Sequence, residues 1–372
     1  MSLQSALLPA EAAEAQALAD SARKVLMDLY PDQMTQETPA GHWPLFAELG
    51  WLGACLPEAV GGSGLPLSAW SVLAETLAPS LMVEPLLSQL ALSGNLLNRA
   101  DGDSVRDSLL GRWMAGEIRP ALVFNGADPL APEHGGWSLR CESRGDGFSL
   151  HGTHSGVADV AGCDALLVVA EEAGECGLFL LPVQAAGVSR DAHTAIDGRT
   201  HWDVELVAAK PDTRLEFSGT LSNALAESAA LHALLLASES LGLMRELTRR
   251  TQQYLLQRQQ FGRPLIEFQA LQHRLVDMLL RITRVEGLLE VARLQVDIAG
   301  LAAAGPFIAA AKASAGEESR RLGREAVQLH GAIGVTDELI IGRMLKRLVS
   351  NELIGGTTAA HAAQWERHRI PL

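Results

Sequence analysis

The sequence predicts an α+β protein with several domains, because three stretches of the chain differ in their pattern of apolar residues. From Glu11 to about Trp113, alanine- and leucine-rich segments repeat at helical spacing. Between about Ala121 and Gly219, the apolar residues form short runs separated by glycine, proline and aspartate, which is typical of strands. From Ala224 onward the helical spacing returns. The predicted order is therefore helices, strands, helices.

Particular segments support each of these assignments. The N-terminal helices are interrupted at Pro57 and by the glycine-rich turn at 61–64. The middle stretch is expected to form a small antiparallel β domain from runs such as 166–169, 177–181 and 202–206. The C-terminal stretch has three main helical patterns, Leu231–Leu256, Leu271–Ala303 and Ala309–Leu329. The predicted domains are 1–120, 121–219 and 220–372.

The composition restricts the class of protein. The 372 residues are 48% hydrophobic, with a mean hydropathy of +0.12, so the chain can bury a large core. A net charge of -14 argues against a general polyanion binder, and no nucleic acid is expected as a partner. The N-terminus has no basic segment followed by a long apolar run, and no apolar run reaches membrane-spanning length. We therefore expect a cytoplasmic protein without a membrane partner.

The cysteines do not form a recognisable site. Their spacing matches neither a set of metal ligands nor a redox motif, so free thiols are expected, with no disulfide framework and no metal site. The four residues are Cys55, Cys141, Cys163 and Cys176.

The most specific motif is the corner 258–264 between two helical patterns, followed by 267–270. Gly262 and Pro264 break the helical pattern, and Arg258 stands just before the break. A planar guanidinium at such a corner could hold a pyrophosphate with two hydrogen bonds. An ordinary turn between helices with a surface arginine explains the same spacing, so both interpretations stay open.

A second motif is the segment 328–335, which contains Gly331 and Gly334. Its small residues either close a helix or let the backbone approach a ligand or another helix. The basic residues Arg343, Lys346 and Arg347 follow at helical spacing, and we interpret them as a solvated charged face.

Together, in this order and at this separation, the two motifs resemble the acyl-CoA dehydrogenase family. The resemblance covers nearly the whole chain, since 48–53 and 57–62 are similar to the family's N-terminal helix and glycine turn. It implies an N-terminal helical domain, a middle β domain and a C-terminal four-helix bundle. It also implies FAD as the cofactor, shared across a dimer interface, and hence an oligomer, for which we expect a dimer of dimers.

The resemblance assigns the cofactor-binding residues. Arg258, Gln260, Gln328 and Gly331 would contact the FAD of the neighbouring subunit, and Phe268 and Gln269 would lie on the helix that packs near it. The complete expected set is Arg258, Gln260, Phe261, Phe268, Gln269, Gln328, Gly331 and Thr357.

The family's catalytic carboxylate is missing from both of its usual positions. The reaction needs a base at the α-carbon of the acyl-CoA while a hydride leaves the β-carbon for the flavin. Most members keep a glutamate in a Glu-Gly-Thr stretch, which here begins with Gly355. A smaller branch keeps it nine residues before Leu241, where this chain has His232, and the arginine that normally follows is Ala233.

Motifs of the middle domain that serve the chain's own flavin are also altered. The family's Thr-Glu-Pro-x-x-Gly-Ser-Asp loop is matched poorly by 125–129, and its Trp-Ile-Thr/Ser segment reads Gly156-Val157-Ala158-Asp159. The motifs that reach the neighbour's flavin are retained. This asymmetry suggests a subunit that completes a catalytic partner's FAD site. Such pairs are known in the family for bulky CoA esters, including those of steroid side-chain breakdown, and 328–331 with 336–338 and 345–347 is most similar to that branch.

Three residues are candidates for a displaced base. His232 could accept a proton near neutral pH, although a lone histidine on an apolar helix is commonly a core residue. Glu239 lies seven residues further along the same pattern, and a glutamate there could equally cap or pair. Glu352 precedes the C-terminal glycines and could equally be an exposed acid.

We therefore expect an acyl-CoA dehydrogenase-like subunit involved in α,β-desaturation of a CoA thioester in fatty acid, lipid or steroid metabolism, with electron-transfer flavoprotein or a similar acceptor as a partner. One alternative is a non-catalytic subunit of a heteromer. Another is a flavin oxidase or monooxygenase on the same fold, because relatives of that kind need no glutamate.

Overall fold

The computed structural model describes residues 9–29, 41–124, 138–144, 147–336 and 339–368, which form two compact units. Unit 1 consists of Met1–Thr38, Pro66–Met82 and Ala233–Leu372, and unit 2 consists of Pro39–Leu65 and Val83–His232. Each unit is described by itself. The domain boundaries at residues 120 and 219 stay a prediction.

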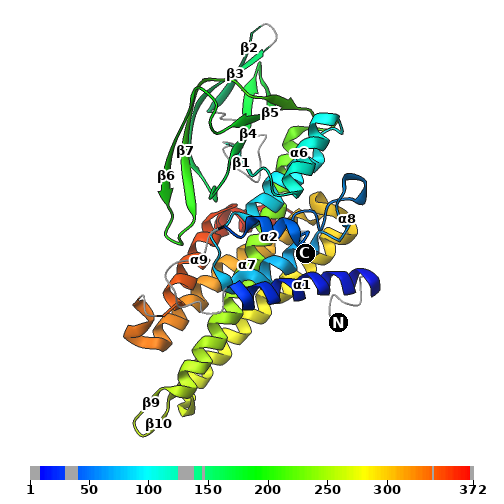
Figure 1. Cartoon of the computed structure of the whole chain (residues 1–372). Helices are drawn as coiled ribbons and strands as arrows, with labels where there is room; N and C mark the ends of the chain where they lie inside the picture. Colours follow the sequence, from blue (N-terminus) through cyan, green and yellow to red (C-terminus); the bar gives the residue numbers. More distant parts are fainter. Residues whose placement is uncertain (1–8, 30–40, 125–137, 145–146, 337–338, 369–372) are drawn as a thin grey trace. The chain divides into compact units, whose positions relative to one another are not determined.

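Unit 1 is helical apart from one small hairpin (Figure 1). Its long helices are the greater part of α7 and the whole of α8, with the hairpin β9–β10 between them. The elements are α1 (Pro9–Leu29), α3 (Ser68–Leu77), a 3-10 turn (Ala78–Ser80), α7 (Leu221–Gln257), β9 (Gln259–Gln260), β10 (Arg263–Pro264), a 3-10 turn (Leu265–Glu267), α8 (Gln269–His330), a 3-10 turn (Gly331–Val335), α9 (Ile341–Leu353) and α10 (Thr358–His368).

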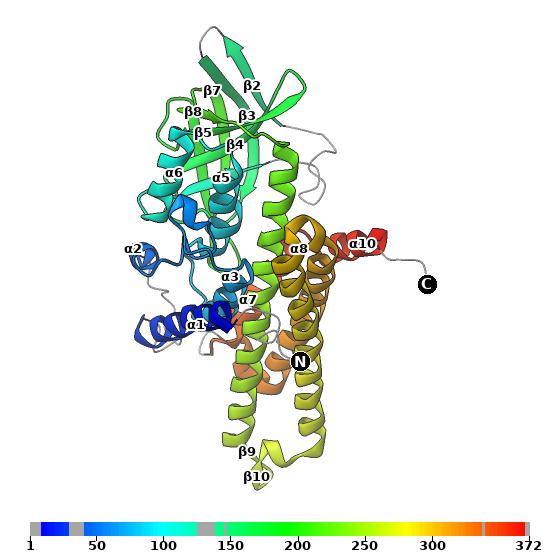
Figure 2. The same cartoon turned by 90° about the vertical axis from the view of Figure 1, so that its right-hand side faces the viewer.

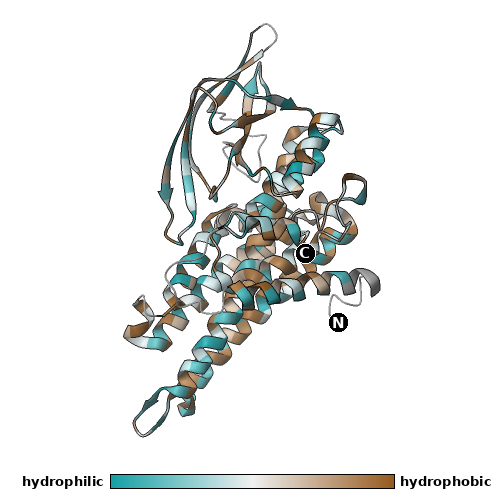
Figure 3. Ribbon diagram, in the orientation of Figure 1, coloured by the Kyte–Doolittle hydropathy of each residue, from teal (hydrophilic) through white to brown (hydrophobic). Residues whose placement is uncertain are grey.

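The helix α8 is two helices joined at Gly300, whose φ of +79° is not helical. The second half therefore turns back, and α9 and α10 both pack on α8. With α7, the two halves of α8 and α9 make four long helical segments, which confirms the expected four-helix bundle. In Figure 3 hydrophobic residues gather where these helices meet, whereas the hairpin is hydrophilic.

By length and composition, the helical segment Gln269–Val335 could cross a membrane. Core helices of soluble proteins meet the same two criteria. Its buried charged residues bind neighbouring parts of the bundle: Arg293 binds Glu75 on α3, and Lys312 binds carbonyl groups at the end of α9. The segment therefore carries no membrane assignment.

Unit 2 contains short helices and one sheet. The helices precede the strands in sequence. The elements are α2 (Trp43–Glu48), a 3-10 turn (Glu58–Val60), α4 (Leu86–Ser88), a π-helical turn (Gln89–Gly94), α5 (Asn95–Arg99), α6 (Ser104–Met114), β1 (Pro120–Val123), β2 (Leu139–Arg144), β3 (Gly147–Val157), β4 (Ala165–Glu172), β5 (Glu175–Pro182), β6 (Val188–Thr194), β7 (Thr200–Ala209) and β8 (Thr213–Leu215). The first part of α7 also belongs to unit 2.

The sheet has the order β6-β7-β3-β2-β4-β5-β8, with β1 paired to β4. Its antiparallel pairs confirm the β domain that the sequence predicts. The sheet is mixed, because β1 and β2 both run parallel to β4. β1 enters the sheet from the helical stretch instead of through a hairpin, and a parallel neighbour needs such a crossover. Strand β4 is buried on both faces along 165–170, which explains its unbroken apolar run.

Close packing in unit 1 depends on one glycine of α7. A Cβ atom at Gly242 would lie 2.1 Å from the carbonyl oxygen of Glu75 and 2.7 Å from the Cβ of Ala78, at the end of α3. The two helices can approach this closely only because the side chain is missing.

We predict that Gly242→Ala destabilises the protein by about 2 kcal/mol or more, since the backbone of α3 must move away. The matched control is Gly111→Ala in α6, an exposed helix position where a Cβ atom meets nothing within 4 Å. The control should stabilise by about 0.5–1 kcal/mol through helix propensity. Urea unfolding measures both variants, and equal effects would contradict the packing described.

Candidate functional site

The corner between α7 and α8 is a tight hairpin at one end of the helix pair (Figure 2). Strands β9 and β10 pair antiparallel, with Gln260 opposite Arg263. The two turn residues, Phe261 and Gly262, have φ angles of +53° and +77°, as a type I′ turn requires. The amide of Leu265 donates to the carbonyl of Arg258 at 2.8 Å and closes the corner.

Aromatic contacts fold the hairpin back onto the start of α8. The Arg263 guanidinium lies 4.1 Å from the ring centre of Phe268, and the Phe261 ring meets that of Phe268 edge to face at 6.1 Å. Phe261 is nevertheless 89% exposed, and Arg258, Gln260 and Gln269 are also exposed. The backbone of the corner is thus fixed while these side chains remain available to a ligand or partner.

The second motif lies at the same end of unit 1. Gln328 is exposed, and Gly331, with a φ angle of +67°, ends α8. The rings of Tyr254 and His330 stack at 4.5 Å, and the Tyr254 hydroxyl donates to the His330 carbonyl at 3.2 Å. The amide of Arg258 in turn donates to the carbonyl of Tyr254 at 2.8 Å. The structure thus brings together two motifs that are far apart in the sequence.

The side chains at this end suit a diphosphate. A guanidinium, two side-chain amides and a glycine at positive φ are exposed on neighbouring elements: Arg258, Gln260, Gln328 and Gly331. Arginine binds phosphate oxygens through two parallel N–H groups, and glycine allows the backbone to approach them. Among the described residues, no group of three or more His, Cys, Asp or Glu could hold a metal ion.

The turn between α9 and α10 contains Gly355, where the sequence resemblance predicts the usual base position. Gly355 and Gly356 have φ angles of +70° and +99°. The ring nitrogen Nε2 of buried His361 donates to the Gly355 carbonyl at 2.8 Å. The hydroxyl of Thr357, a predicted cofactor ligand, accepts from the amide of Ala360 at 3.2 Å and so caps α10.

A buried lysine holds this turn from α8. The Lys312 ammonium, 2% exposed, donates to the carbonyls of Asn351 at 2.7 Å, Gly356 at 3.2 Å and Glu352 at 3.4 Å. Burial lowers the pKa of Lys312 to about 8, and the nearby Glu352 partly opposes that shift. One turn further along α8, Gly316 leaves room for Thr358, because a Cβ atom there would lie 2.4 Å from the Thr358 hydroxyl.

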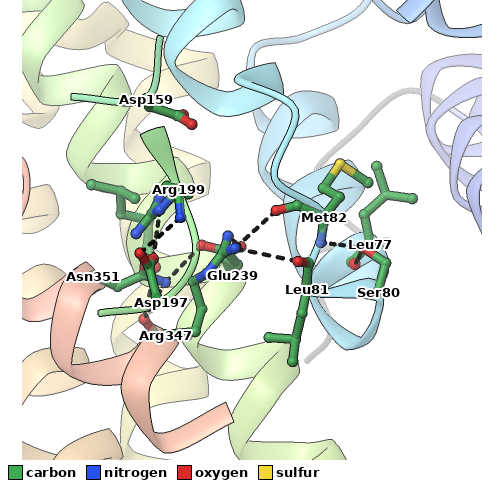
Figure 4. A network of polar contacts seen from close by, with 12 residues as sticks. Leu77, Ser80, Leu81, Met82, Asp159, Asp197, Arg199, Glu239, Arg347 and Asn351 are labelled. Atoms are coloured by element: carbon green, nitrogen blue, oxygen red, sulfur yellow. Dashed lines mark hydrogen bonds and ion pairs between the residues drawn. The ribbon is translucent and has the colours of Figure 1, made fainter. Parts of the chain in front are cut away.

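Glu239 belongs to a buried polar network (Figure 4). One carboxylate oxygen accepts from Arg347 at 3.1 Å and the other accepts from the Asn351 amide at 2.7 Å. The same guanidinium donates to the carbonyls of Leu81 and Met82 at 3.3 and 2.9 Å. The network therefore ties α7 to α9 and to the turn after α3, and both oxygens of Glu239 are engaged in it.

The interpretation of Arg343, Lys346 and Arg347 as one solvated face is wrong for Arg347. Its side chain is 3% exposed and paired with Glu239. The reason is the helical position: Met344 and Leu348, which flank Arg347 on α9, are buried, whereas Lys346 is exposed.

The other two candidate bases, Glu352 and His232, are respectively bound to neighbouring side chains and buried. Glu352 accepts from the Thr358 hydroxyl at 3.2 Å and pairs with Arg320 at 3.5 Å, so it fastens α9 to α10 and α8. His232 is buried in α7 and 5% exposed. It stands about two helical turns before Glu239.

In unit 2, the segment that replaces Trp-Ile-Thr/Ser has a distorted backbone. Gly156 has a φ angle of +77°, and a Cβ atom there would meet nothing within 4 Å. Buried Asp159 has a φ angle of +59° and accepts from the Ser88 hydroxyl at 2.9 Å. The space next to Gly156, where the sequence resemblance predicts a tryptophan in the family, is thus open. The other altered motif, 125–129, lies outside the described residues.

Comparison with known proteins decides the family. The models for the acyl-CoA dehydrogenase N-terminal domain and C-terminal domain match residues 12–117 and 223–369. The chain belongs to the acyl-CoA dehydrogenase family. This confirms the resemblance and the order of helices, sheet and helices.

Several relatives match over nearly the whole chain. Acyl-CoA dehydrogenase FadE27 of Mycobacterium tuberculosis (strain ATCC 25618 / H37Rv) is 25% identical over 88% of this chain and 87% of its own. The 3-sulfinopropanoyl-CoA desulfinase of Paraburkholderia xenovorans (strain LB400) is 27% identical over 91% and 92%. Family membership alone therefore does not determine the reaction.

Solved structures show the same fold. A variant of the Tcur3481-Tcur3483 steroid acyl-CoA dehydrogenase superposes with a TM-score of 0.82 at 27% identity, covering 96% of this chain and 98% of that one. The ChsE4-ChsE5 complex from Mycobacterium tuberculosis gives 0.83 at 22% identity with the same coverage.

Three residues of these sites have roles that the sequence analysis did not assign. Tyr254 lies four residues before Arg258, one helical turn away, which is the only local signal for it. Lys312 is the lone charge in an alanine-rich stretch, a pattern that can mark a buried cation. Arg347 lies between apolar residues at helical spacing, which distinguishes it from Lys346.

We predict a pH-dependent contribution of Lys312 to stability. Its pKa of about 8 in the folded protein is below the usual value of about 10.4 in an unfolded chain, so between these values the unfolded state binds more protons. Stability should therefore rise with pH in this window, by about 2 kcal/mol between pH 8 and pH 10 relative to Lys312→Met. Urea unfolding of both proteins across this range measures the difference, and a pH-independent difference would contradict the assignment.

A double-mutant cycle tests the buried pair Glu239–Arg347. Arg347→Leu should cost about 3–5 kcal/mol, because Glu239 then stays buried without its cation. Combining it with Glu239→Leu should restore a large part of that loss, since both buried charges are removed. Chemical unfolding gives the three free energies. Additive losses would mean that the two side chains do not act as a pair.

Proposed function

We propose that this chain is an acyl-CoA dehydrogenase subunit that completes the FAD site of a catalytic homologue, within an oligomer that desaturates an acyl-CoA thioester at its α,β-bond. One observation carries the proposal. The exposed side chains Arg258, Gln260 and Gln328 lie on elements that the contact between Tyr254 and His330 brings together. The two positions where the resemblance predicts the base are Gly355 and His232.

The donor end would act by binding and orientation. Arg258 would hold a phosphate through two N–H groups, Gln260 and Gln328 would donate or accept through their amides, and Gly331 would let the backbone come close. FAD bound there supplies the hydride acceptor for the β-carbon of the substrate. Because the donors point out of the subunit, the flavin they hold would belong chiefly to a neighbour.

The hydrogen bonds and ion pairs of Glu239 and Glu352 support the need for a catalytic partner subunit. The two glutamates considered as displaced bases are engaged: Glu239 by Arg347 and Asn351, and Glu352 by Thr358 and Arg320. A general base must reach the α-proton of the substrate within hydrogen-bond distance. Freeing Glu239 would leave the buried cation of Arg347 without its anion, which is costly.

An apolar row on α8 supports an oligomer. Val276, Leu279 and Leu280 are each more than half exposed and lie on neighbouring turns of the helix. Exposed apolar side chains in contiguous groups mark surfaces that contact other proteins.

The comparisons suggest the substrate class. Two structural neighbours with the same fold are named as the Tcur3481-Tcur3483 steroid dehydrogenase and the ChsE4-ChsE5 complex, each with two components. By analogy, we propose a bulky CoA ester, including a steroid-derived one, as the substrate of the complex. Electron-transfer flavoprotein or a similar acceptor would remove the electrons, and the cytoplasm is the proposed location.

A second candidate is direct desaturation by a homo-oligomer of this chain. The observation that favours it is the buried imidazole of His232, which stands where one branch of the family keeps its base. Histidine is a common general base near neutral pH. This candidate requires the chain to hold flavin without a homologue.

The experiment replaces the phosphate-binding arginine. The tagged chain is isolated from its own cells with the subunits that accompany it, and bound FAD is measured by visible absorbance. Arg258→Ala should lower the affinity of the complex for FAD by about tenfold or more, because a charge-assisted contact is lost. The matched control is Arg321→Ala on α8, whose exposed ion pair with Glu317 contributes little. Unchanged FAD affinity in Arg258→Ala would overturn the proposal.

A further inference from the structure

The two halves of the donor surface come from separate parts of the bundle. Arg258 and Gln260 follow α7, whereas Gln328 and Gly331 end the second half of α8. A diphosphate bound by both halves requires a fixed spacing between them, because hydrogen-bond strength falls steeply with distance and angle. Contacts between the ends of α7 and α8 must therefore set that spacing.

One such contact joins Tyr254 and His330. Their rings stack at 4.5 Å with an interplanar angle of 29°. The Tyr254 hydroxyl donates to the His330 carbonyl at 3.2 Å. His330 is 5% exposed, and its Nδ1 lies 2.8 Å from the carbonyl of Ala326, which fixes the ring against its own helix.

Each residue of this contact is connected to a residue of the donor surface, Tyr254 by a hydrogen bond and His330 by the chain itself. The Tyr254 carbonyl accepts the amide of Arg258 at 2.8 Å, and the Arg258 carbonyl accepts the amide of Leu265 at 2.8 Å, so the arginine backbone is held on both sides. His330 immediately precedes Gly331, and Gln328 lies two residues before it. A displacement of one ring would therefore move one half of the surface relative to the other.

Burial keeps the contact between Tyr254 and His330 uncharged. The pKa of His330 is lowered by burial, against a smaller opposing effect of its hydrogen bond to Ala326. A neutral imidazole stacks on the phenol without bringing a charge into the buried contact.

From these contacts we propose that Tyr254 and His330 are positioning residues, which set the distance between the Arg258 half and the Gln328–Gly331 half of the diphosphate-binding surface. They act through the donors and do not touch the cofactor. The proposal rests on the proposed function, since it concerns the same surface. It adds to the proposed function a fixed contact behind the binding residues, which diphosphate binding by those residues does not by itself imply.

The test is a double-mutant cycle in the isolated complex, read as the dissociation constant of FAD after removal and re-addition of the flavin. Tyr254→Leu removes ring and hydroxyl and should weaken FAD binding by about tenfold or more. Tyr254→Phe keeps the stacked ring and loses only one hydrogen bond, so it should weaken binding by no more than about fivefold.

The combination with Arg258→Ala separates positioning from general structural support. If Tyr254 acts through Arg258, the variant Tyr254→Leu/Arg258→Ala binds FAD no more weakly than Arg258→Ala alone. Losses that add fully in the double variant would overturn the proposal, and so would wild-type affinity in Tyr254→Leu.

Two controls keep the result interpretable. If Tyr254→Leu does not fold, His330→Leu carries the test, because it removes the other ring of the stacked pair. Wild-type affinity for FAD in His330→Leu would contradict the positioning role. If Arg258→Ala itself leaves FAD binding unchanged, the proposed function fails. If Arg258→Ala weakens binding while the Tyr254 and His330 variants do not, only the positioning role fails.

Discussion

The stacked contact between Tyr254 and His330 is the interaction on which the proposed site depends. The break at Gly300 turns the second half of α8 back, and the contact then fastens its end to the end of α7. This contact lies next to both Arg258 and Gln328, which stand on different helix ends. With it, they form one donor surface, and the two glycines at positive φ, Gly262 and Gly331, give this surface its turns.

The same bundle uses its buried charges for structure. Arg347 and Glu239 connect α7 and α9 to the turn after α3, and Lys312 holds the carbonyls at the end of α9. Each buried charge is costly unless it is paired or hydrogen-bonded, so these side chains are not readily released for chemistry. Hydrogen bonds from Lys312 and His361 thus hold the glycine turn at Gly355, which carries no carboxylate. A well-formed turn without a carboxylate, at the position where the resemblance predicts the base, agrees with the proposed partner subunit.

The architecture could be predicted from the sequence, because helical spacing and short β runs are local signals. The break after Arg258 is also a local signal, but the cofactor-binding residues are assigned by the resemblance to the family. The parallel placement of β1 beside β4 could not be predicted, since strand order is not encoded in the local pattern. Nor could the burial of Arg347, which has the same charge and nearly the same spacing as its exposed neighbour Lys346. The engagement of Glu239 depends on residues more than a hundred positions away, and only the folded chain brings them into contact.

The central claim is that this chain supplies half of a flavin site and needs a homologue for the rest. The most direct measurement is the visible absorption spectrum of the chain purified alone, recorded before and after incubation with excess FAD and desalting. The account predicts a colourless protein that retains no flavin. Retention of about one FAD per chain, the stoichiometry that a complete family site would give, would contradict it and favour a homo-oligomeric enzyme with His232 as a displaced base.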